Sequence, residues 1–329
     1  MKLKTESKDP LGILSSTKPI VESSQFIRIH ESHLNDISKL ISEKLKNGID
    51  TEEMHFGSTG NFKDDIQLIF LEDVVNFCFW TEKDKPKWKI EWPKGIITQG
   101  GWYSLTKCFQ RALAQKIPIL NADYLTKLTM SQTESFFMGI SGIKIPLLKE
   151  RMINFREAGK VLKKKYNGKF INCLESAEFD AIKIIKLLLD DFPSFRDIST
   201  WEGKSIYFLK RAQICAQDFS YINKDGKGIK IKNIENLTAF ADYKIPQMLR
   251  KYAVISYEKS LENKIDNYIL IPKGSHEEIE IRSATIWCTE LIRQKLGKYT
   301  ASEIDNALWL ISQDQSDVKP YHRTYTTYY

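Results

Sequence analysis

Apolar residues recur at helical spacing along most of the chain. The spacing predicts a first helix over residues 26–45, with apolar residues on one face and charged residues on the other. Beyond Trp102 the same period predicts further helices over residues 105–113, 146–166, 179–192, 204–219, 279–296 and 302–311. The pattern indicates a mainly α-helical protein.

Residues 65–92 follow a different pattern. An apolar and aromatic run leads to Lys83-Asp84-Lys85-Pro86-Lys87, after which Trp88, Ile90 and Trp92 alternate with charged residues. Alternation around a polar turn predicts short strands. Residues 223–228, Asn-Lys-Asp-Gly-Lys-Gly, predict the tip of a hairpin or of a long surface loop. The predicted fold class is therefore mainly α with a few short strands.

The domain organisation follows from where periodicity is missing. Residues 1–24 are rich in Lys, Ser, Thr and Pro and lack a sustained period, so we expect a mobile N-terminal tail there. The total of 329 residues would suffice for about two average domains. However, no internal repeat or low-complexity linker divides residues 25–329, and we expect them to form a single domain.

Composition and charge narrow the classes of protein. Hydrophobic residues make up 42% of the chain and charged residues 28%, which is typical of a globular protein. The formal net charge of +7 suits the binding of one or two phosphates better than the binding of a long duplex. Five cysteines, scattered singly, predict neither a zinc site nor a disulfide framework. With no apolar signal segment or membrane span, we expect a monomeric cytoplasmic protein, and a nuclear location stays open.

Three motifs that suggest chemistry have simpler structural explanations. His30 and His33 are not accompanied by further metal ligands, which favours a solvated helix face. Gly57-Ser58-Thr59-Gly60 resembles a phosphate loop, but the lysine that such a loop needs does not follow it. Residues 163–165, all lysine, lie at the end of a predicted helix, where cations are stabilised by the helix dipole. We expect no metal and no cofactor.

Asp242 stands in the apolar and aromatic segment 237–250, four residues before Pro246. Because proline favours the first turn of a helix, the carboxylate is predicted near a helix N-terminus, in a partly desolvated pocket. The alternative is a helix cap with no further role.

Charged residues also stand in other apolar segments. Lys210 and Arg211 interrupt an apolar helical pattern, and Glu280 and Arg282 are predicted to form an inward-facing ion pair. The C-terminal segment 308–329 is aromatic and basic up to its end, and we expect it to pack against the rest of the protein.

The chain resembles the queuosine salvage protein family, the queuosine 5′-phosphate N-glycosylase/hydrolases, from about Phe26 to Tyr329. Eight motifs in the family's order carry the resemblance: Asn76-Phe77-Cys78-Phe79-Trp80, Gly101-Trp102-Tyr103-Ser104-Leu105, Glu175-Ser176-Ala177-Glu178, Phe192-Pro193-Ser194-Phe195-Arg196-Asp197, Lys210-Arg211-Ala212-Gln213, Phe240-Ala241-Asp242-Tyr243, Glu280-Ile281-Arg282 and Leu308-Trp309.

The resemblance implies a fold and an activity. The fold would be similar to that of the helix-hairpin-helix DNA glycosylases. The activity would be hydrolysis of the N-glycosidic bond of queuosine 5′-monophosphate, and less well of queuosine, which releases queuine for salvage into tRNA.

The resemblance also implies site residues. It places the catalytic carboxylate on Asp242 and contacts to the base on His55, Phe240 and the segment around Trp309 and Asp314. Leu310 stands where the family often has an acidic residue, so a hydrogen bond to the base is either lost or supplied by Asp314 or Asp305. For the 5′-phosphate we expect the cations of the apolar and aromatic segments, namely Lys210, Arg211, His322 and Arg323.

Cleavage of a ribosyl C–N bond builds positive charge on the sugar, which a carboxylate beneath the ring stabilises. Asp242 could act by electrostatics, which we favour, or through a covalent adduct. Two other functions stay open. A DNA or RNA base glycosylase would act on a flipped base and would need a basic groove. A non-catalytic tRNA- or nucleotide-binding protein would use the aromatic and basic C-terminal segment.

Overall fold

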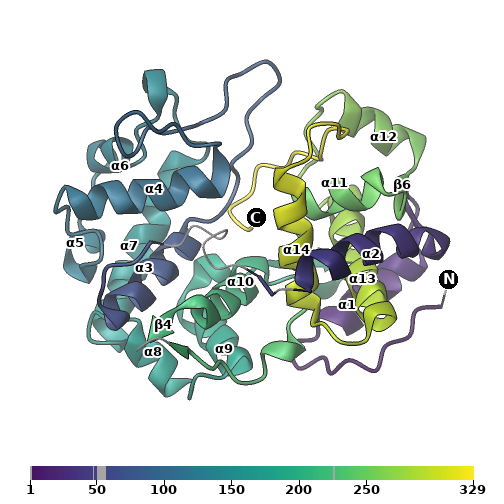
Figure 1. The fold of residues 1–329 in the computed structure, drawn as a ribbon, viewed down its shortest axis with the longest axis horizontal. Helices are drawn as coiled ribbons and strands as arrows, with labels where there is room; N and C mark the ends of the chain where they lie inside the picture. Colours follow the sequence, from purple (N-terminus) through teal and green to yellow (C-terminus); the bar gives the residue numbers. More distant parts are fainter. Residues whose placement is uncertain (1, 47, 50–56, 225–226) are drawn as a thin grey trace.

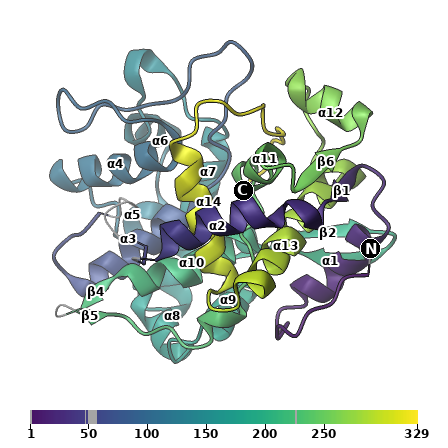
Figure 2. The same ribbon diagram turned by 45° about the vertical axis from the view of Figure 1, so that its right-hand side comes forward.

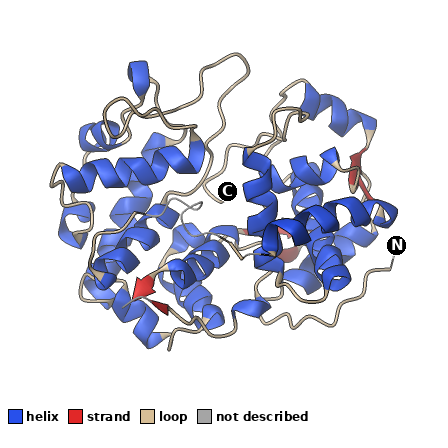
Figure 3. Ribbon diagram, viewed as in Figure 1, coloured by secondary structure: helices blue, strands red, loops and turns tan. Residues whose placement is uncertain are grey.

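Helices form nearly all of the regular structure in the computed structural model, which describes every residue except 1, 47, 50–56 and 225–226 (Figures 1 and 3). The α-helices of this part of the chain are α1 (Ile13–Glu22), α2 (Leu34–Leu45), α3 (Phe62–Val74), α4 (Gly101–Ala114), α5 (Ala122–Thr126), α6 (Met130–Phe136), α7 (Leu148–Lys165), α8 (Ile171–Ser176), α9 (Ala181–Asp191), α10 (Lys210–Asp218), α11 (Lys244–Lys251), α12 (Lys259–Asp266), α13 (His276–Leu296) and α14 (Ala301–Gln313).

The strands are short and pair in antiparallel twos. Strand β1 (Ile27–Ile29) pairs with β6 (Ile255–Tyr257), β2 (Ile198–Trp201) with β3 (Lys204–Tyr207), and β4 (Asn223–Lys224) with β5 (Lys227–Gly228). The last pair confirms the hairpin predicted from the turn residues. The predicted fold class, mainly α with a few short strands, is confirmed.

The helices form two halves, each with its own hydrophobic core. Helices α3 to α10 make one half, and α2 with α11 to α14 make most of the other (Figure 1). Helix α2 crosses α13 and α14 (Figure 2). Helix α13 serves both cores, because Ile279 and Trp287 pack into the first and Ile281 and Cys288 into the second. Buried residues lie on all sides of this helix, and they include charged ones such as Glu280 and Arg282.

The N-terminal segment corrects the prediction of a mobile tail. Residues 13–22 form α1, in which Ile13, Leu14 and Ile20 are buried in the first core. The side chain of Thr17 accepts a hydrogen bond of 3.1 Å from the indole Nε1 of Trp287 in α13. The apolar period is present in the sequence but is interrupted by Thr17 and by Pro19, which lies inside the helix.

Residues 65–92 correct the prediction of strands. Every residue from Asp65 to Val74 is buried in α3, and an apolar run buried on all sides does not distinguish a helix from a strand by its period. Within the described part of 75–99, pairing is limited to one isolated bridge between Glu91 and Ile97.

Two helices begin later in the chain than predicted, because strand β1 precedes α2 and strand β3 precedes α10. The other predicted helices are confirmed, with shifted ends.

A buried arginine joins distant parts of the chain. The guanidinium of Arg282 donates hydrogen bonds of 2.8 and 2.5 Å to the two carboxylate oxygens of Asp197, and its Nε donates to the carbonyl of Ala241 at 3.1 Å. Phe208 and Tyr329 lie against the guanidinium, with ring centroids 4.0 and 4.4 Å from its central carbon.

The predicted pairing of Arg282 with Glu280 is wrong, because residues two apart on a helix point in different directions. Instead, the Glu280 carboxylate accepts hydrogen bonds from Ser24 Oγ and from the backbone N–H groups of Gln25 and Phe26.

Replacement of Arg282 by methionine should lower the free energy of unfolding by about 3–5 kcal/mol, because it leaves the buried Asp197 carboxylate without its cation. Urea denaturation of the two proteins measures this difference. Lys144→Met is the control, since Lys144 pairs with Glu134 at the surface, and its stability should stay close to that of the unmodified protein. A similar small effect for both variants would contradict the role given to Arg282.

Candidate functional site

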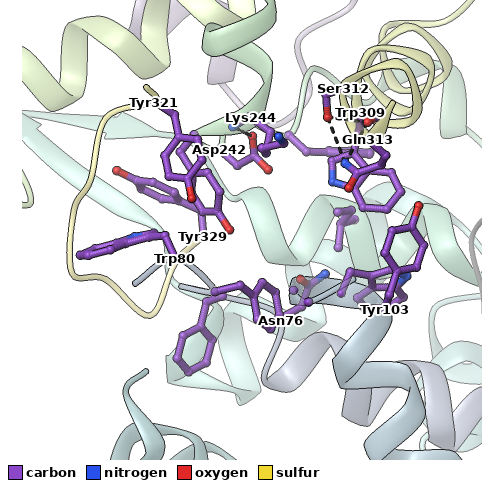
Figure 4. A pocket seen from close by; sticks show the side chains of 18 of the residues that line it. Asn76, Trp80, Tyr103, Asp242, Lys244, Trp309, Ser312, Gln313, Tyr321 and Tyr329 are labelled. Carbon is purple, nitrogen blue, oxygen red and sulfur yellow. Dashed lines mark hydrogen bonds between the residues drawn. The ribbon is translucent and has the colours of Figure 1, made fainter. Parts of the chain in front are cut away.

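A cavity of about 280 Å³ lies between the two halves. Its walls come from the segment after α3, the start of α4, one face of α10, the segment that leads into α11, α14 and the C-terminal segment (Figure 4). The lining residues are Asn76, Phe77, Phe79, Trp80, Lys87, Gln99, Gly100, Gly101, Trp102, Tyr103, Lys210, Ile214, Asp218, Phe240, Asp242, Tyr243, Lys244, Asp305, Asn306, Trp309, Ser312, Gln313, Gln315, Tyr321 and Tyr329.

Asp242 lies at the N-terminus of α11, as the sequence predicts. Its Oδ1 accepts hydrogen bonds from the backbone N–H groups of Lys244 at 2.7 Å and Ile245 at 3.2 Å. Pro246 follows within the first turn and needs no hydrogen-bond partner for its nitrogen. The carboxylate is thus held in one orientation by the helix, whose N-terminus attracts negative charge, and it is half-buried in the cavity wall.

Lys210 begins α10 and lies in the cavity wall with only 5% of its surface exposed. Burial lowers the pKa of its ammonium group, and the negative charges of Asp242, Asp73 and Asp305 oppose that shift. Its backbone N–H donates a hydrogen bond of 3.0 Å to Asp197, the carboxylate that Arg282 holds. The position of this lysine is therefore fixed by the buried ion pair described above.

Asp305 on α14 is hydrogen-bonded to the backbone of Phe240. Its Oδ1 accepts a hydrogen bond of 2.9 Å from the backbone N–H of Phe240. Burial, together with the charge of Asp242, raises the pKa of Asp305 to about 8. Trp309 lies one turn further along α14, and its ring centroid is 5.7 Å from that of Tyr103 on α4. Figure 4 shows this aromatic pair on one side of the cavity, and Trp80, Tyr321 and Tyr329 on the other.

Two buried arginines hold the segment that forms the floor of the cavity. Arg151 on α7 donates to the carbonyls of Val75, Phe77 and Cys78. Arg211 donates to the carbonyls of Asp73 and Val74, and also to that of Ser194. The backbone N–H of Cys78 in turn donates to the carbonyl of Tyr329 at 2.8 Å, which confirms that the C-terminal segment packs against the protein.

Of the site residues predicted from the sequence, the structure brings five to the cavity: Lys210, Phe240, Asp242, Asp305 and Trp309. His55 lies outside the described residues. Asp314 ends α14 and is exposed, away from the lining. The guanidinium of Arg211 donates to backbone carbonyls. That of Arg323 lies over the ring of Tyr268, with its central carbon 4.1 Å from the ring centroid.

His322, which was predicted to bind the phosphate, does not line the cavity. The ring is buried outside the lining, with Nε2 3.4 Å from the hydroxyl of Tyr329. Burial and the nearby charge of Arg282 lower the pKa of His322 to about 3, so the ring is neutral and carries no charge for a phosphate.

The sequence missed several residues that line the cavity. Asn76, Trp80 and Tyr103 belong to motifs that carry the family resemblance, but the motifs gave them no role. Lys244 follows Asp242 by two residues, and Lys87 lies in the lysine-rich turn that was expected between two strands.

Within the described ranges, no group of three or more His, Cys, Asp or Glu side chains is arranged to hold a metal ion. None of the helices described is long and apolar enough to cross a membrane.

Comparison with known proteins points to one family. The family model for the queuosine salvage protein matches residues 55–329. The chain is 35% identical to the queuosine 5′-phosphate N-glycosylase/hydrolase of Sphaerobacter thermophilus over 328 residues, which is 98% of both chains. It is 35% identical to the protein of that name from Bos taurus, over 80% of this chain and 81% of the relative. For the Schizosaccharomyces pombe protein the identity is 34%, over 76% and 75% of the two chains.

The neutral, buried His322 should make the protein less stable in mild acid. Between pH 6.5 and about 3 the unfolded chain binds a proton at this ring and the folded chain does not. Lowering the pH through this window should therefore cost up to about 1.4 kcal/mol of unfolding free energy per pH unit. His322→Gln lacks this contribution, so the stability difference between the two proteins should shrink from pH 7 to pH 5. Urea denaturation at several pH values tests this, and a difference that does not change with pH would contradict it.

Proposed function

The chain belongs to the queuosine salvage protein family, and on that basis we propose that it hydrolyses the N-glycosidic bond of queuosine 5′-phosphate, with Asp242 as the catalytic carboxylate. One observation carries the assignment of Asp242. Its carboxylate is fixed at a helix N-terminus in the wall of a cavity whose lining includes the aromatic side chains of Phe240 and Trp309. A flat base and a developing positive charge on its sugar would both be accommodated there.

The reaction needs charge stabilisation rather than a strong acid. As the bond between C1′ and the base nitrogen breaks, its electron pair leaves with the base and positive charge develops on the ribose. Asp242 would stabilise that charge without reorienting, because two backbone N–H groups already hold its other side. A water molecule then adds to C1′, and the proton that it loses balances the proton that the departing base takes up, which completes the hydrolysis.

Lys210 fits the role of counter-ion to Asp242 better than that of phosphate ligand. Of the carboxyl groups around it, Asp242 acts most strongly on its charge, and a phosphate dianion placed beside that carboxylate would be repelled. We therefore assign Lys210 to the positioning and neutralisation of the catalytic carboxylate.

The base would lie between Phe240 and the pair formed by Trp309 and Tyr103. Phe240 is held in place by the hydrogen bond from its backbone to Asp305, so the wall that it forms is rigid. The leaving base is a 7-deazaguanine, which has carbon at the position where a purine accepts a proton. Contacts with the rest of the ring must therefore stabilise its departure.

The 5′-phosphate would lie between Lys87 and Lys244. Both line the cavity, and Lys87 is exposed whereas Lys244 is partly buried. Burial lowers the pKa of Lys244; the charge of Asp242 opposes this shift, and the positive charge of Lys87 adds to it. The two ammonium groups are thus close enough to repel each other. A phosphate dianion between them would turn this repulsion into attraction.

The cavity is close to the size of a small-molecule site. We therefore propose that the protein acts as a monomer on the free nucleotide, without a stable nucleic-acid complex.

Asp242→Asn should lower kcat for queuosine 5′-phosphate by roughly a hundred- to thousandfold, because it removes one charge that stabilises the transition state. Chromatographic detection of released queuine measures the rate. Asparagine can still cap α11, so the melting temperature should change little. A large fall in melting temperature with turnover preserved would make Asp242 a structural cap and would contradict the proposal.

Lys87→Gln and Lys244→Gln should each lower kcat/KM for queuosine 5′-phosphate about ten- to hundredfold, with little change for queuosine, since only the nucleotide carries the charge-assisted hydrogen bond. Lys85→Gln is the matched control, because Lys85 is exposed in the same turn and lies outside the cavity lining. Equal losses on both substrates would show that the phosphate binds elsewhere.

A further inference from the structure

One face of α10 runs along the cavity from the catalytic carboxylate to a second charged residue. Lys210, Ile214 and Asp218 follow one another at intervals of four residues, and all three line the cavity. Eight residues of α-helix span about 12 Å. Lys210 is at the end near Asp242, so Asp218 marks a polar region further along the same wall.

Asp218 is a buried acid with one unpaired carboxyl oxygen among the described residues. Its residue surface is 2% exposed, and its Oδ1 has no hydrogen-bond partner among the residues that the structure describes. Burial raises the pKa of its carboxyl group; the charges of Asp73 and Glu72 raise it further, and that of Lys210 opposes the shift. Buried polar atoms without partners are uncommon and require an explanation.

Further unpartnered oxygens lie next to Asp218. In the described part of the chain, Asp73 Oδ2 and both carboxyl oxygens of Glu72 also lack hydrogen-bond partners. Asp73 Oδ1 accepts a hydrogen bond of 3.1 Å from Asn76, which itself lines the cavity. Burial raises the pKa of all three carboxyl groups, and they lie close enough to act on one another behind one end of the cavity.

Lys210 acts on both Asp73 and Asp218, but its charge is shared with Asp242 and Asp305. Arg211, the nearest arginine in sequence, directs its guanidinium at the backbone carbonyls of Asp73, Val74 and Ser194. Among the described residues, no ion pair within 4.0 Å reaches Asp218. The three carboxyls are not arranged to hold a metal ion either. A protonated amine that enters through the cavity would supply the hydrogen-bond donor that Asp218 Oδ1 lacks.

The substrate of the proposed function carries such a cation. Its base bears a side arm with a secondary amine, which is protonated at neutral pH, and the arm leaves the five-membered ring that also carries the ribose. Amine and ribose are therefore separated by only a few bonds. If the ribose lies over Asp242, the arm can extend along α10 past Ile214.

Resting on the proposed function, we propose that Asp218 binds the protonated secondary amine of the side arm and so selects nucleotides whose base carries a cationic arm. Ammonium and carboxylate would form a charge-assisted hydrogen bond out of contact with water.

The test compares two substrates that differ only in the arm, queuosine 5′-phosphate and 7-deazaguanosine 5′-phosphate. Asp218→Asn should lower kcat/KM for the first about ten- to hundredfold and leave that for the second within about a factor of two. Asp314→Asn is the control, because this carboxylate is exposed and outside the cavity, and it should leave the ratio of the two substrates unchanged. An unchanged ratio for Asp218→Asn, or equal losses on both substrates, would overturn the proposal.

A second measurement does not depend on the folding of the variant or on turnover. Calorimetry should show that the unmodified protein binds free queuine about ten- to hundredfold more tightly than queuine whose side-arm amine has been acetylated and is neutral. Equal affinities would overturn the role of Asp218. Failure of the unmodified protein to release queuine from the nucleotide would instead overturn the proposed function, so the two failures are distinguishable.

Discussion

The geometry of the cavity depends on one buried cation, the guanidinium of Arg282. Through Asp197 it fixes the first residue of α10, because Lys210 donates its backbone N–H to the same carboxylate. Through the carbonyl of Ala241 it also fixes the residue that precedes Asp242. The proposed catalytic carboxylate and its proposed counter-ion are thus each linked to one buried ion pair through a neighbouring backbone hydrogen bond. Burial makes this pair costly to break, since either partner alone would be a charge without compensation.

The distribution of charge in the cavity matches the two ends of the proposed substrate. Lys87 and Lys244 would face the phosphate, and Asp218 would face the ammonium of the arm. Between them, Asp242 and Lys210 compensate each other, while the aromatic side chains of Phe240 and Trp309 supply flat, uncharged walls. A substrate with a negative and a positive end would therefore be bound in one direction only, which places its glycosidic bond at Asp242.

Patterns in neighbouring residues of the sequence predicted part of the fold and of the site. Helical periodicity predicted α4, α7, α9, α13 and α14, and Pro246 predicted the helix that holds Asp242. Pairings across long stretches of chain were not predictable: Asp197 lies 85 residues before Arg282, and no local pattern links them. The sequence also did not predict that Arg211 donates to backbone carbonyls whereas Lys244 lines the cavity. Both are cations in apolar sequence, and only the tertiary structure decides which one meets a ligand. Helix α3 was missed because a segment buried on every side has no amphipathic period.

The central claim is that the ribose of queuosine 5′-phosphate lies at Asp242 with its base between the aromatic walls. A crystal structure of the Asp242→Asn protein with the intact nucleotide tests it most directly. The account predicts C1′ within about 4 Å of the side chain at position 242, the distance from which a carboxylate can act on the reacting carbon. It also predicts the base against Phe240 and Trp309. A nucleotide bound with its ribose away from position 242, or outside the cavity, would contradict the account.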